Sequence, residues 1–253
     1  ELPYGISQGL TSTANEYIAN GAVFAFEDPA TYGDLDANVL ILQTAPEIPI
    51  YEVQNPMESI DEAEQEQLLR ALEYNPQAVS SYITGSEIVI QEGIDTLRFF
   101  HSGAITYSYH GKEGDQARYI VSADDLGNQV EKTRKLLINV LEGRSGDGRP
   151  YLMDVDYQQD GSIVISYGSS VNGSPVHIFS QQYAAQFVIQ NKCISEFSIF
   201  VRQYIATDEP VPVLPEKQAV AAVRALGQQG KELTLCYFDT GEGQKVTAKW
   251  IAH

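Results

Sequence analysis

The chain has 253 residues, of which 43% are hydrophobic and 20% are charged. This composition is typical of a globular protein and excludes disorder as the default interpretation. The formal net charge of −18 opposes binding to nucleic acid and to anionic lipid, because both require clustered Lys and Arg side chains. No apolar run of about 18 residues occurs, so no membrane-spanning segment is expected within this sequence.

The negative charge is concentrated at the N-terminal end of the chain. Residues 1–75 contain fourteen acids and a single base, Arg70, whereas the rest of the chain contains twenty acids and fifteen bases. An acidic surface keeps a protein soluble, and this is the preferred interpretation. Binding of a dedicated basic partner is the alternative.

Two features bear on the cellular compartment. The chain begins Glu1-Leu2-Pro3-Tyr4, without a start methionine or a basic-then-apolar leader. We expect that a signal peptide or an N-terminal anchor precedes it, although a cytoplasmic protein begun at an internal position would look the same. Cys193 and Cys236 are compatible both with a disulfide and with two buried thiols, so they leave the compartment open.

Three helices are predicted from hydrophobic periodicity and from their end signals. In the first, Ser59 and Glu62 form a capping box that satisfies free backbone amides. The second has acids in its first turn, where negative charge suits the helix dipole. The third opens with Pro215, which is favoured at a first helical position. The predicted ranges are 59–75, 122–142 and 215–226.

Between the helices, alternating apolar residues and tight turns predict antiparallel strands. Asp160-Gly161 and Asn172-Gly173 are predicted turns, because these residue types tolerate positive φ. The predicted strands are 22–27, 38–44, 49–53, 87–92, 95–101, 104–109, 116–121, 151–158, 162–167, 175–179, 186–190, 193–204, 232–238 and 245–251.

A helix followed by a meander occurs near 59–121 and again near 122–204, and a helix-plus-hairpin unit closes the chain. The layout predicts an α+β fold, with helices packed on one face of curved antiparallel sheets in repeated helix-then-meander units. We place a boundary at about residue 121. It separates an acidic N-terminal α+β region, 1–121, from a C-terminal α+β region, 122–253.

The sequence Asp239-Thr240-Gly241 resembles the carboxylate loop of aspartic proteases. That chemistry requires a second Asp and a sizeable fold after the motif. Only twelve residues follow Gly241, and the first of them is the additional acid Glu242. A glycine-rich hairpin turn is therefore the preferred interpretation.

The residues Asp154, Asp156 and Asp160 resemble the start of a calcium-binding loop. The EF-hand pattern requires Asp or Asn at position 5 and Glu at position 12, but Gln158 and Ile165 stand there. The preferred interpretation places Asp154 and Asp156 on the solvent face of a strand and Asp160 in its turn.

No constellation for catalysis is found. Ser169 and Ser170 follow Gly168 without the second glycine of a nucleophile elbow, and no phosphate-binding loop occurs. The histidines lack the i, i+4 spacing of helical metal ligands, and each is interpreted as a polar residue at a strand end. They are His101, His110, His177 and His253. We therefore predict no catalytic, cofactor-binding or metal-binding residue, and no enzyme.

The sequence contains fifteen tyrosines, several of them in or beside predicted strands. Core and sheet packing is the default interpretation, because Tyr packs its ring and keeps its hydroxyl hydrated. An exposed tyrosine cluster that binds a protein is the alternative. The tyrosines concerned are Tyr107, Tyr109, Tyr167, Tyr183 and Tyr204.

A series of short motifs fills the second half of the chain. They are Ile165–Tyr167, Asn172–Val176, Phe197–Tyr204, Leu214–Val220, Leu235–Tyr237 and Lys249–Ile251. In order, they form a tyrosine strand with its turn, a long strand, a short helix, and terminal tyrosine and tryptophan strands. This series, over about residues 122–253, resembles YycH and YycI, a family of extracytoplasmic regulators in Gram-positive bacteria.

The resemblance implies a protein held at the extracytoplasmic face of the membrane by one N-terminal helix that precedes this sequence. It implies direct contact with a cell-wall-controlling sensor histidine kinase or with a sister regulator, and it implies no catalytic residues or cofactors. Two other functions remain open. One is a secreted, PepSY-like inhibitor or chaperone of a peptidase, and the other is a hydrolase with an unrecognised carboxylate pair.

Overall fold

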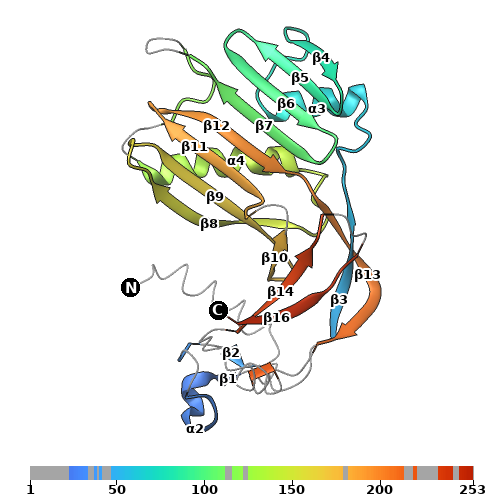
Figure 1. Cartoon of the computed structure of the whole chain (residues 1–253), viewed down its shortest axis with the longest axis vertical. Coiled ribbons are helices and arrows are strands. Elements are labelled where there is room, and N and C mark those ends of the chain that lie inside the picture. The colour runs from blue at the N-terminus through green and yellow to red at the C-terminus, as the bar shows by residue number, and fades with distance from the viewer. Residues whose placement is uncertain are drawn as a thin grey trace, which may run out of the picture. The chain divides into compact units, whose positions relative to one another are not determined.

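The computed structural model describes residues 23–252 except 34–36, 39, 42–46, 112–115, 122–124, 179–181, 214–218, 221–232 and 242–244. Most of the described residues form strands and few form helices, so the fold is α+β and sheet-rich (Figure 1). The helical elements are η1 (Ala25–Glu27), α2 (Pro29–Tyr32), α3 (Glu62–Ala71) and α4 (Leu126–Leu141).

The strands are named in chain order. They are β1 (Val23–Phe24), β2 (Leu40–Ile41), β3 (Glu47–Gln54), β4 (Ser80–Thr84), β5 (Glu87–Glu92), β6 (Asp95–Phe100), β7 (Ala104–Tyr109), β8 (Arg149–Tyr157), β9 (Ile163–Val171), β10 (Ser174–Ile178), β11 (Ala185–Gln190), β12 (Cys193–Phe200), β13 (Gln203–Pro212), β14 (Leu233–Asp239), β15 (Lys245–Val246) and β16 (Ala248–Ala252).

The chain divides into two compact units. Unit 1 consists of Glu1–Ile48, Pro210–Leu235 and Lys249–His253, and unit 2 consists of Pro49–Glu209 and Cys236–Ala248. In unit 1, β1 pairs with β2, and Ala25 and Tyr32 are buried together. Unit 2 contains α3, α4 and the large sheet. The boundary expected at residue 121 stays a prediction.

The large sheet of unit 2 is antiparallel, in the order β8-β9-β11-β12-β7-β6-β5-β4. Strand β9 is longer than β11, and its last residues pair instead with β10, which in turn pairs in parallel with β14. Strands β8 and β4 therefore form the two opposite edges of the antiparallel sheet (Figure 1).

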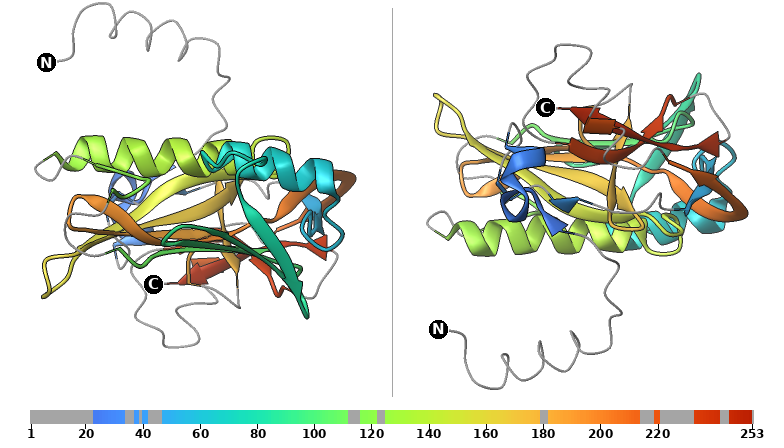
Figure 2. Two further views of the ribbon diagram at one scale, coloured as in Figure 1. Left: turned by 90° about the horizontal axis from the view of Figure 1, so that it is seen from above. Right: turned by 90° about the horizontal axis from the view of Figure 1, so that it is seen from below.

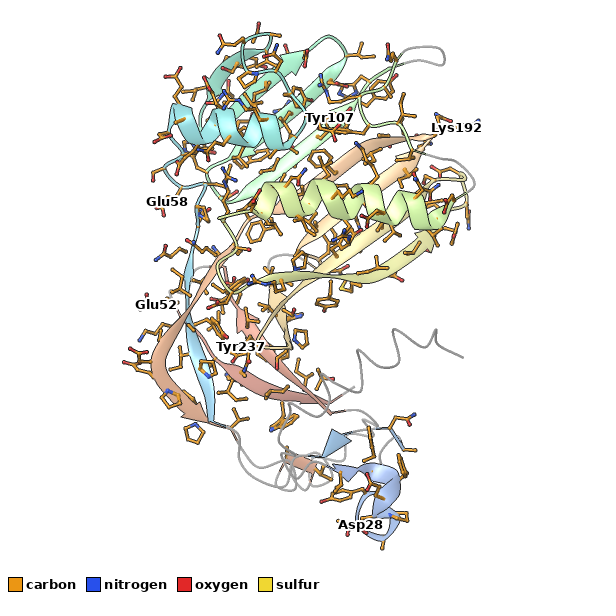
Figure 3. The ribbon with its side chains drawn as sticks, turned by 180° about the vertical axis from the view of Figure 1, so that it is seen from behind. Asp28, Glu52, Glu58, Tyr107, Lys192 and Tyr237 are labelled. Atoms are coloured by element: carbon orange, nitrogen blue, oxygen red, sulfur yellow. The ribbon has the colours of Figure 1, made fainter. Side chains whose placement is uncertain are left out.

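Helices α3 and α4 lie on the same face of this sheet (Figure 2). Their buried leucines pack into one hydrophobic core with the alternate strand residues that point toward the helices, as amphipathic elements require. Aromatic rings fill the centre of the core. The ring of Tyr107 on β7 stacks on that of Phe197 on β12 with centroids 5.0 Å apart, and Figure 3 shows Tyr107 among the side chains of the sheet.

Tyrosine hydroxyl groups join the helices to the sheet. The Tyr167 hydroxyl on β9 donates to the carbonyl oxygen of Val130 at 2.9 Å and lies 2.8 Å from the Thr133 hydroxyl, both on α4. Tyr119 similarly donates to the carbonyl oxygen of Leu72, next to the end of α3. These buried hydroxyls satisfy polar groups that would otherwise be costly inside the core.

The helix starts differ in part from the sequence prediction. Helix α3 begins at Glu62, and its capping box consists of Asp61 and Glu64 instead of Ser59 and Glu62. The earlier start is wrong because the chain turns first: Met57 N donates to Asn55 Oδ1 at 3.0 Å, and the Met57 side chain is buried. The C-terminal end of α4 agrees better with the prediction. The helix ends at Leu141, and Gly143, which was predicted to end it, has a φ of 72°.

Several strands and turns were predicted closely, and others were not. Strands β5 and β7 have the predicted bounds, and Gly161 and Gly173 have positive φ in their turns. Strand β4 was not predicted. Residues 116–121 form no strand, only a bridge from Ile120 to Cys193, and the long strand expected at 193–204 is divided into β12 and β13.

Two further predictions differ from the structure or lie largely outside it. The strand predicted at 22–27 is short, because β1 ends at Phe24 and η1 follows it, and α2 was not predicted. The helix expected at 215–226 lies outside the described residues except for 219–220, which are helical.

The capping box of α3 generates a first prediction. Asp61→Ala removes the carboxylate that accepts from Glu64 N at 2.8 Å, so we expect the free energy of unfolding to fall by about 1 kcal/mol. Ser59→Ala is the matched control and should leave the free energy of unfolding nearly unchanged. Urea unfolding of both variants measures the difference, and an effect at Ser59 larger than at Asp61 would contradict the observed start.

Candidate functional site

The edge strand β8 exposes apolar side chains on both of its faces. Among the described residues it pairs only with β9. Tyr151, Leu152, Met153 and Tyr157 have exposed fractions of 39%, 46%, 44% and 64%. Exposed aliphatic and aromatic side chains that gather on one edge are typical of a protein-binding surface.

The strand register shows which of these side chains lie on the helix-covered face. Leu152 pairs with the buried Tyr167, and Tyr157 pairs with Ile163, which packs against the core. Partners in an antiparallel pair share a face, so Leu152 and Tyr157 lie on the side of the sheet that α4 covers. They extend the apolar surface of the sheet past the margin of the core.

Helix α4 adds to this surface. Ile138 is 41% exposed, and Arg134 and Glu142 precede and follow it by four residues, so the three lie on one face of the helix. A groove of about 690 Å³ lies along this face and along the segment that leads into β8. Its lining residues are Arg134, Ile138, Asn139, Leu141, Glu142, Gly143, Ser145, Gly146, Gly148, Arg149 and Pro150.

The segment that borders the groove is fixed to β13. Asp147 N donates to the carbonyl oxygen of Tyr204 at 2.8 Å, and Tyr204 N donates to the carbonyl oxygen of Ser145 at 3.1 Å. Gly146 between them has a φ of 59°, and a Cβ atom there would lie 2.2 Å from the Tyr204 carbonyl oxygen. Only glycine permits this approach, so the groove has a fixed wall.

The lining of the groove contains two bases, Arg134 and Arg149, and one acid, Glu142. Residues 126–149 contain five bases and three acids. Arg134 donates two hydrogen bonds to Glu131, at 2.7 and 2.9 Å, and these bonds lower the pKa of Glu131 to about 2. Arg149 donates to the carbonyl oxygens of Gly146 and Gly148 and, among the described residues, has no carboxylate partner. We call Arg134, Ile138, Arg149, Leu152 and Tyr157 the α4–β8 flank.

A second polar site is buried, around Asp239. Its carboxylate accepts two hydrogen bonds from the Arg202 guanidinium, from Nε at 3.0 Å and from Nη2 at 2.8 Å. The Tyr204 hydroxyl and Gly241 N also donate to it, at 3.1 and 2.8 Å. Asp239 is completely buried, and Arg202 is 8% exposed. The site joins β14 to the residues that connect β12 with β13.

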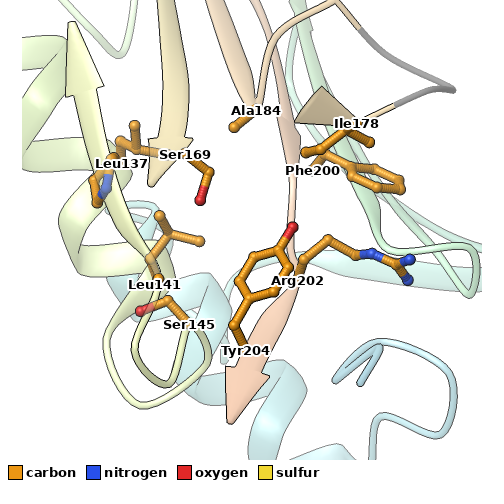
Figure 4. A pocket seen from close by; sticks show the side chains of 11 residues that line it. Leu137, Leu141, Ser145, Ser169, Ile178, Ala184, Phe200, Arg202 and Tyr204 are labelled. Carbon is orange, nitrogen blue, oxygen red and sulfur yellow. The ribbon is translucent and has the colours of Figure 1, made fainter. Parts of the chain in front are cut away.

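A small cavity adjoins this site (Figure 4). Its volume is about 20 Å³, enough for roughly one water molecule. Leu137 and Leu141 of α4 form one wall, and Tyr204 and Arg202 supply polar groups on another. A single water could therefore find hydrogen-bond partners there, but no substrate-sized molecule fits.

Electrostatics hold Asp239 in its ionised form. Burial raises the pKa of this carboxyl, but the hydrogen bonds from Arg202 and Gly241 N, the charge of Arg202 and the hydrogen bond from Tyr204 outweigh burial and leave the pKa lowered. Burial also raises the pKa of Tyr204, with the Asp239 charge as the next cause. The Asp239 carboxylate, the Arg202 guanidinium and the Tyr204 hydroxyl bind one another away from solvent, so the site serves as a structural anchor.

A third polar site surrounds Arg118. Its Nε donates to Asp95 Oδ2 at 3.0 Å, and the Tyr107 hydroxyl donates to Asp95 Oδ1 at 2.9 Å. The guanidinium also binds Glu92 and lies 3.8 Å from the centroid of the Tyr74 ring. In the described part of the chain, this guanidinium makes its polar contacts with Asp95, Glu92 and the carbonyl oxygen of Glu73, all in unit 2, so the site stabilises the fold.

The acids singled out from the sequence belong to two segments, Asp239 to the end of β14 and Asp154, Asp156 and Asp160 to β8 and the turn after it. Gly241 N donates to Asp239 and Gly241 has a φ of 82°, so Asp239-Thr240-Gly241 forms the predicted turn. The burial of Asp239 was missed. Asp154 and Asp156 are exposed on β8, and Asp160 accepts from Ser162 N at 3.0 Å in the hairpin turn.

The predicted histidines and serines form no joint site. His101 and His110 follow β6 and β7, His177 lies on β10 against Phe238, and His253 is outside the described residues. The Ser170 hydroxyl donates to the carbonyl oxygen of Arg149. In the described parts of the chain, no group of three or more His, Cys, Asp or Glu side chains could hold a metal ion.

Three of the five tyrosines named from the sequence belong to the core, as the default interpretation held: Tyr107, Tyr167 and Tyr204 are at most 2% exposed. Tyr109 is half-buried and packs against the core, and Tyr183 is half-buried. Among the residues that the structure describes, the exposed tyrosines are Tyr151 and Tyr157 on β8, together with Tyr82 on β4. The sequence alone does not locate them. Their exposure follows from their position on edge strands, and that position depends on the order of the strands in the sheet.

The two cysteines are free thiols. Each is 4% exposed, Cys193 at the start of β12 and Cys236 in β14. Burial is the largest cause that raises the pKa of both thiols. As for membrane insertion, no helix among the described residues is long and apolar enough to cross a bilayer.

The buried ion pair generates a second prediction. Asp239→Asn leaves the Arg202 charge without its partner, and we expect the free energy of unfolding at pH 7 to fall by about 3–5 kcal/mol. Arg202→Met should cost a similar amount, and the double variant Arg202→Met/Asp239→Asn should cost less than the sum of the two single losses. Urea unfolding of the four proteins measures the coupling, and additive losses would contradict it.

The lowered pKa of Asp239 gives this prediction a pH dependence. A carboxyl with a lowered folded-state pKa stabilises the protein above its ordinary value of 3.8, and this contribution is lost as the pH falls through the folded-state value. The difference between the native protein and Asp239→Asn should therefore shrink below about pH 4. A difference that stays constant down to the acid transition would contradict this assignment.

The thiols generate a third prediction. Because both are buried and protonated, a disulfide-exchange reagent that absorbs on reaction should modify neither Cys193 nor Cys236 in the native protein. In denaturant without reductant, two thiols per chain should react. Fewer than two would show a disulfide, and fast reaction of the native protein would show that one thiol is accessible.

The chain was compared with known proteins, and no relative was found. No family model, curated protein or solved structure matches the chain. The function is therefore inferred from the surfaces and buried groups of the chain itself.

Proposed function

We propose that the chain is a non-catalytic domain that binds another protein through the α4–β8 flank. The observation that carries this proposal is the gathering of exposed apolar side chains on one sheet edge, beside the basic segment of an acidic protein. Leu152, Tyr157 and Ile138 are each more than two-fifths exposed. Burying them against a partner would release apolar surface from water.

The chemistry of the flank favours a protein over a small molecule. Tyr and Arg are enriched among the residues that dominate binding energy at protein interfaces, and aliphatic neighbours exclude water around them. The groove is long and open, with its polar groups at Arg134, Glu142 and Arg149 instead of at one convergent point. A small ligand would require convergent polar groups in a more enclosed pocket.

The flank binds through side chains and not by adding a strand to β8. Pro150 carries no backbone N–H, and a register shift between Leu152 and Asp154 interrupts the ladder. Asp154 and Asp156 add exposed charge to the same strand. These are the devices by which sheet edges resist strand pairing. The excess of bases in residues 126–149 favours an apolar partner surface with an acidic border.

The partner follows from the resemblance to YycH and YycI. We propose an extracytoplasmic regulator that contacts a sensor histidine kinase or a sister regulator, with an N-terminal membrane anchor outside this sequence. The order of elements supports the proposed helix-then-meander repeat. Helix α3 precedes β4–β7, α4 precedes β8, β9, β11 and β12, and the last strands of the two series, β7 and β12, pair with each other.

The proposal generates a fourth prediction. Leu152→Asp/Tyr157→Asp places charge on the flank without entering the core, so the fold should persist while partner capture is lost. Crosslinking of the full-length protein in cells, read by mass spectrometry, should recover a sensor kinase or a sister regulator with the native flank. Ile94→Asp, in the turn between β5 and β6, also places charge on an exposed apolar residue of unit 2 and lies outside the flank, so it is the matched control and should retain capture.

Three outcomes would contradict the proposal. Equal capture by the native protein and the flank variant would show that the flank is not the binding surface. Recovery of a peptidase would favour the secreted, PepSY-like inhibitor. Turnover of a substrate by the purified chain would show that it is an enzyme.

A further inference from the structure

Strand β4 forms the other edge of the sheet, and it differs from β8 in almost every respect. All five of its residues are exposed, with Tyr82 at 49% and Ile83 at 74%. Among the described residues it pairs only with β5, in an uninterrupted register from Ser80 to Thr84. The strand thus presents one regular, open edge.

The hairpin geometry shows which backbone groups face outward. Only Gly85 and Ser86 separate β4 from β5, so Thr84 and Glu87 form the hydrogen-bonded pair next to the turn. Hydrogen-bonded and non-hydrogen-bonded pairs alternate along antiparallel strands. The N–H and C=O groups of Ser81 and Ile83 therefore point away from β5, toward the free edge.

The β4 edge lacks the devices that protect β8. The sequence Ser80-Ser81-Tyr82-Ile83-Thr84 contains no charge and no proline, and its register shows no bulge. Thr, Tyr and Ile all favour extended backbone. Natural proteins usually blunt an open edge with one of these devices, so their absence on a regular edge points to a strand that is meant to be paired.

The sequence around β4 has an excess of acids. From Glu58 to Glu92 it contains eight acids and one base, Arg70, which is paired with Glu66. Glu73, Glu87 and Glu92 are paired with Lys132, Arg98 and Arg118 from outside this stretch. Four of these acids, Glu58, Asp61, Glu62 and Glu64, are exposed at and before the start of α3, and Figure 3 shows Glu58 projecting from this end of unit 2. The charge opposes an acidic segment and attracts a basic one.

We propose that β4 accepts an extended, basic segment of another protein as an additional antiparallel or parallel strand. The backbone of the segment pairs with the outward groups of Ser81 and Ile83. Ile83 pairs with Ile88 and so lies on the helix-covered face, where an apolar side chain of the segment contacts it. Tyr82 lies on the other face, where its ring can receive a Lys or Arg side chain.

A second copy of this chain is a poorer occupant. Pairing of β4 with β4 would bring two acidic regions together. Five residues also bury far less than the roughly 800 Å² per partner of a stable interface. A basic segment avoids the repulsion and needs only the affinity of a transient interaction.

The fifth prediction tests this inference with a synthetic probe. The probe is a peptide of about seven residues that alternates valine and lysine, close to the usual length of a strand. A fluorescent label on the peptide reports binding by anisotropy, and NMR should show the Ser81 and Ile83 amide signals shift more than that of Tyr82. Because attraction between charges is screened by salt, binding should weaken between about 0.05 and 0.5 M salt.

Substitutions separate strand addition from simple charge attraction. Ser81→Pro removes an outward N–H while leaving the β4–β5 hydrogen bonds in place, and it should weaken peptide binding by about tenfold or more. Ser81→Ala keeps the N–H and is the matched control. Leu152→Asp/Tyr157→Asp alters only the flank on β8 and should bind the peptide normally, so this inference and the proposed function fail independently.

The outcomes are distinct. Equal affinity of the native protein and Ser81→Pro, or of the peptide and a version N-methylated at alternate residues, would show attraction by charge alone and overturn the proposal. A concentration-dependent dimer that Ser81→Pro abolishes, seen by analytical ultracentrifugation, would assign the edge to a second copy instead. If Ser81→Pro loses the native circular dichroism spectrum, the N-methylated peptide decides alone.

Discussion

The antiparallel pairing of β7 with β12 is the contact on which the rest of unit 2 depends. It joins strands from distant parts of the chain and makes one sheet of two antiparallel series. The stacked rings of Tyr107 and Phe197 lie on this pair, and Phe187 packs against Phe197 from the next strand, so the cores under α3 and α4 are continuous. Because the central strands of this antiparallel sheet are paired on both sides, β4 and β8 are its two edges in the described part of the chain.

The two edges have opposite physical characters. Strand β8 exposes apolar side chains, but proline, a register shift and aspartates disrupt its outer ladder, and the segment before it carries an excess of bases. Strand β4 keeps a regular backbone beside a strongly acidic stretch. One edge is suited to contact through side chains and the other to contact through main-chain hydrogen bonds. A single sheet can in this way hold two partners of opposite charge without competition between them.

Local signals in the sequence were sufficient for some elements and not for others. Turns such as Asp160-Gly161 and half-buried strands such as β5 have their own chemical signatures, and they were located closely. Strand β4 was missed because neither of its faces is buried, which removes the alternation of apolar and polar residues. Ser59–Glu62 and Asp61–Glu64 both satisfy the capping pattern, and the burial of Met57 decides between them. Asp239 was assigned to a turn correctly, but its contact with Arg202 joins residues 37 positions apart and depends on the tertiary fold.

The β7–β12 pairing also has a consequence for the order in which the chain is made. About 84 residues separate Tyr109, at the end of β7, from Cys193, at the start of β12. At a synthesis rate of roughly 5–20 residues per second, β7 waits on the order of ten seconds for its partner. During that interval its uncharged sequence, Ala-Ile-Thr-Tyr-Ser-Tyr, forms the edge of a growing sheet. Nascent chains on one polysome would then carry identical unpaired strands at close spacing, which makes crowding during synthesis the stage at which this fold is most vulnerable to mispairing.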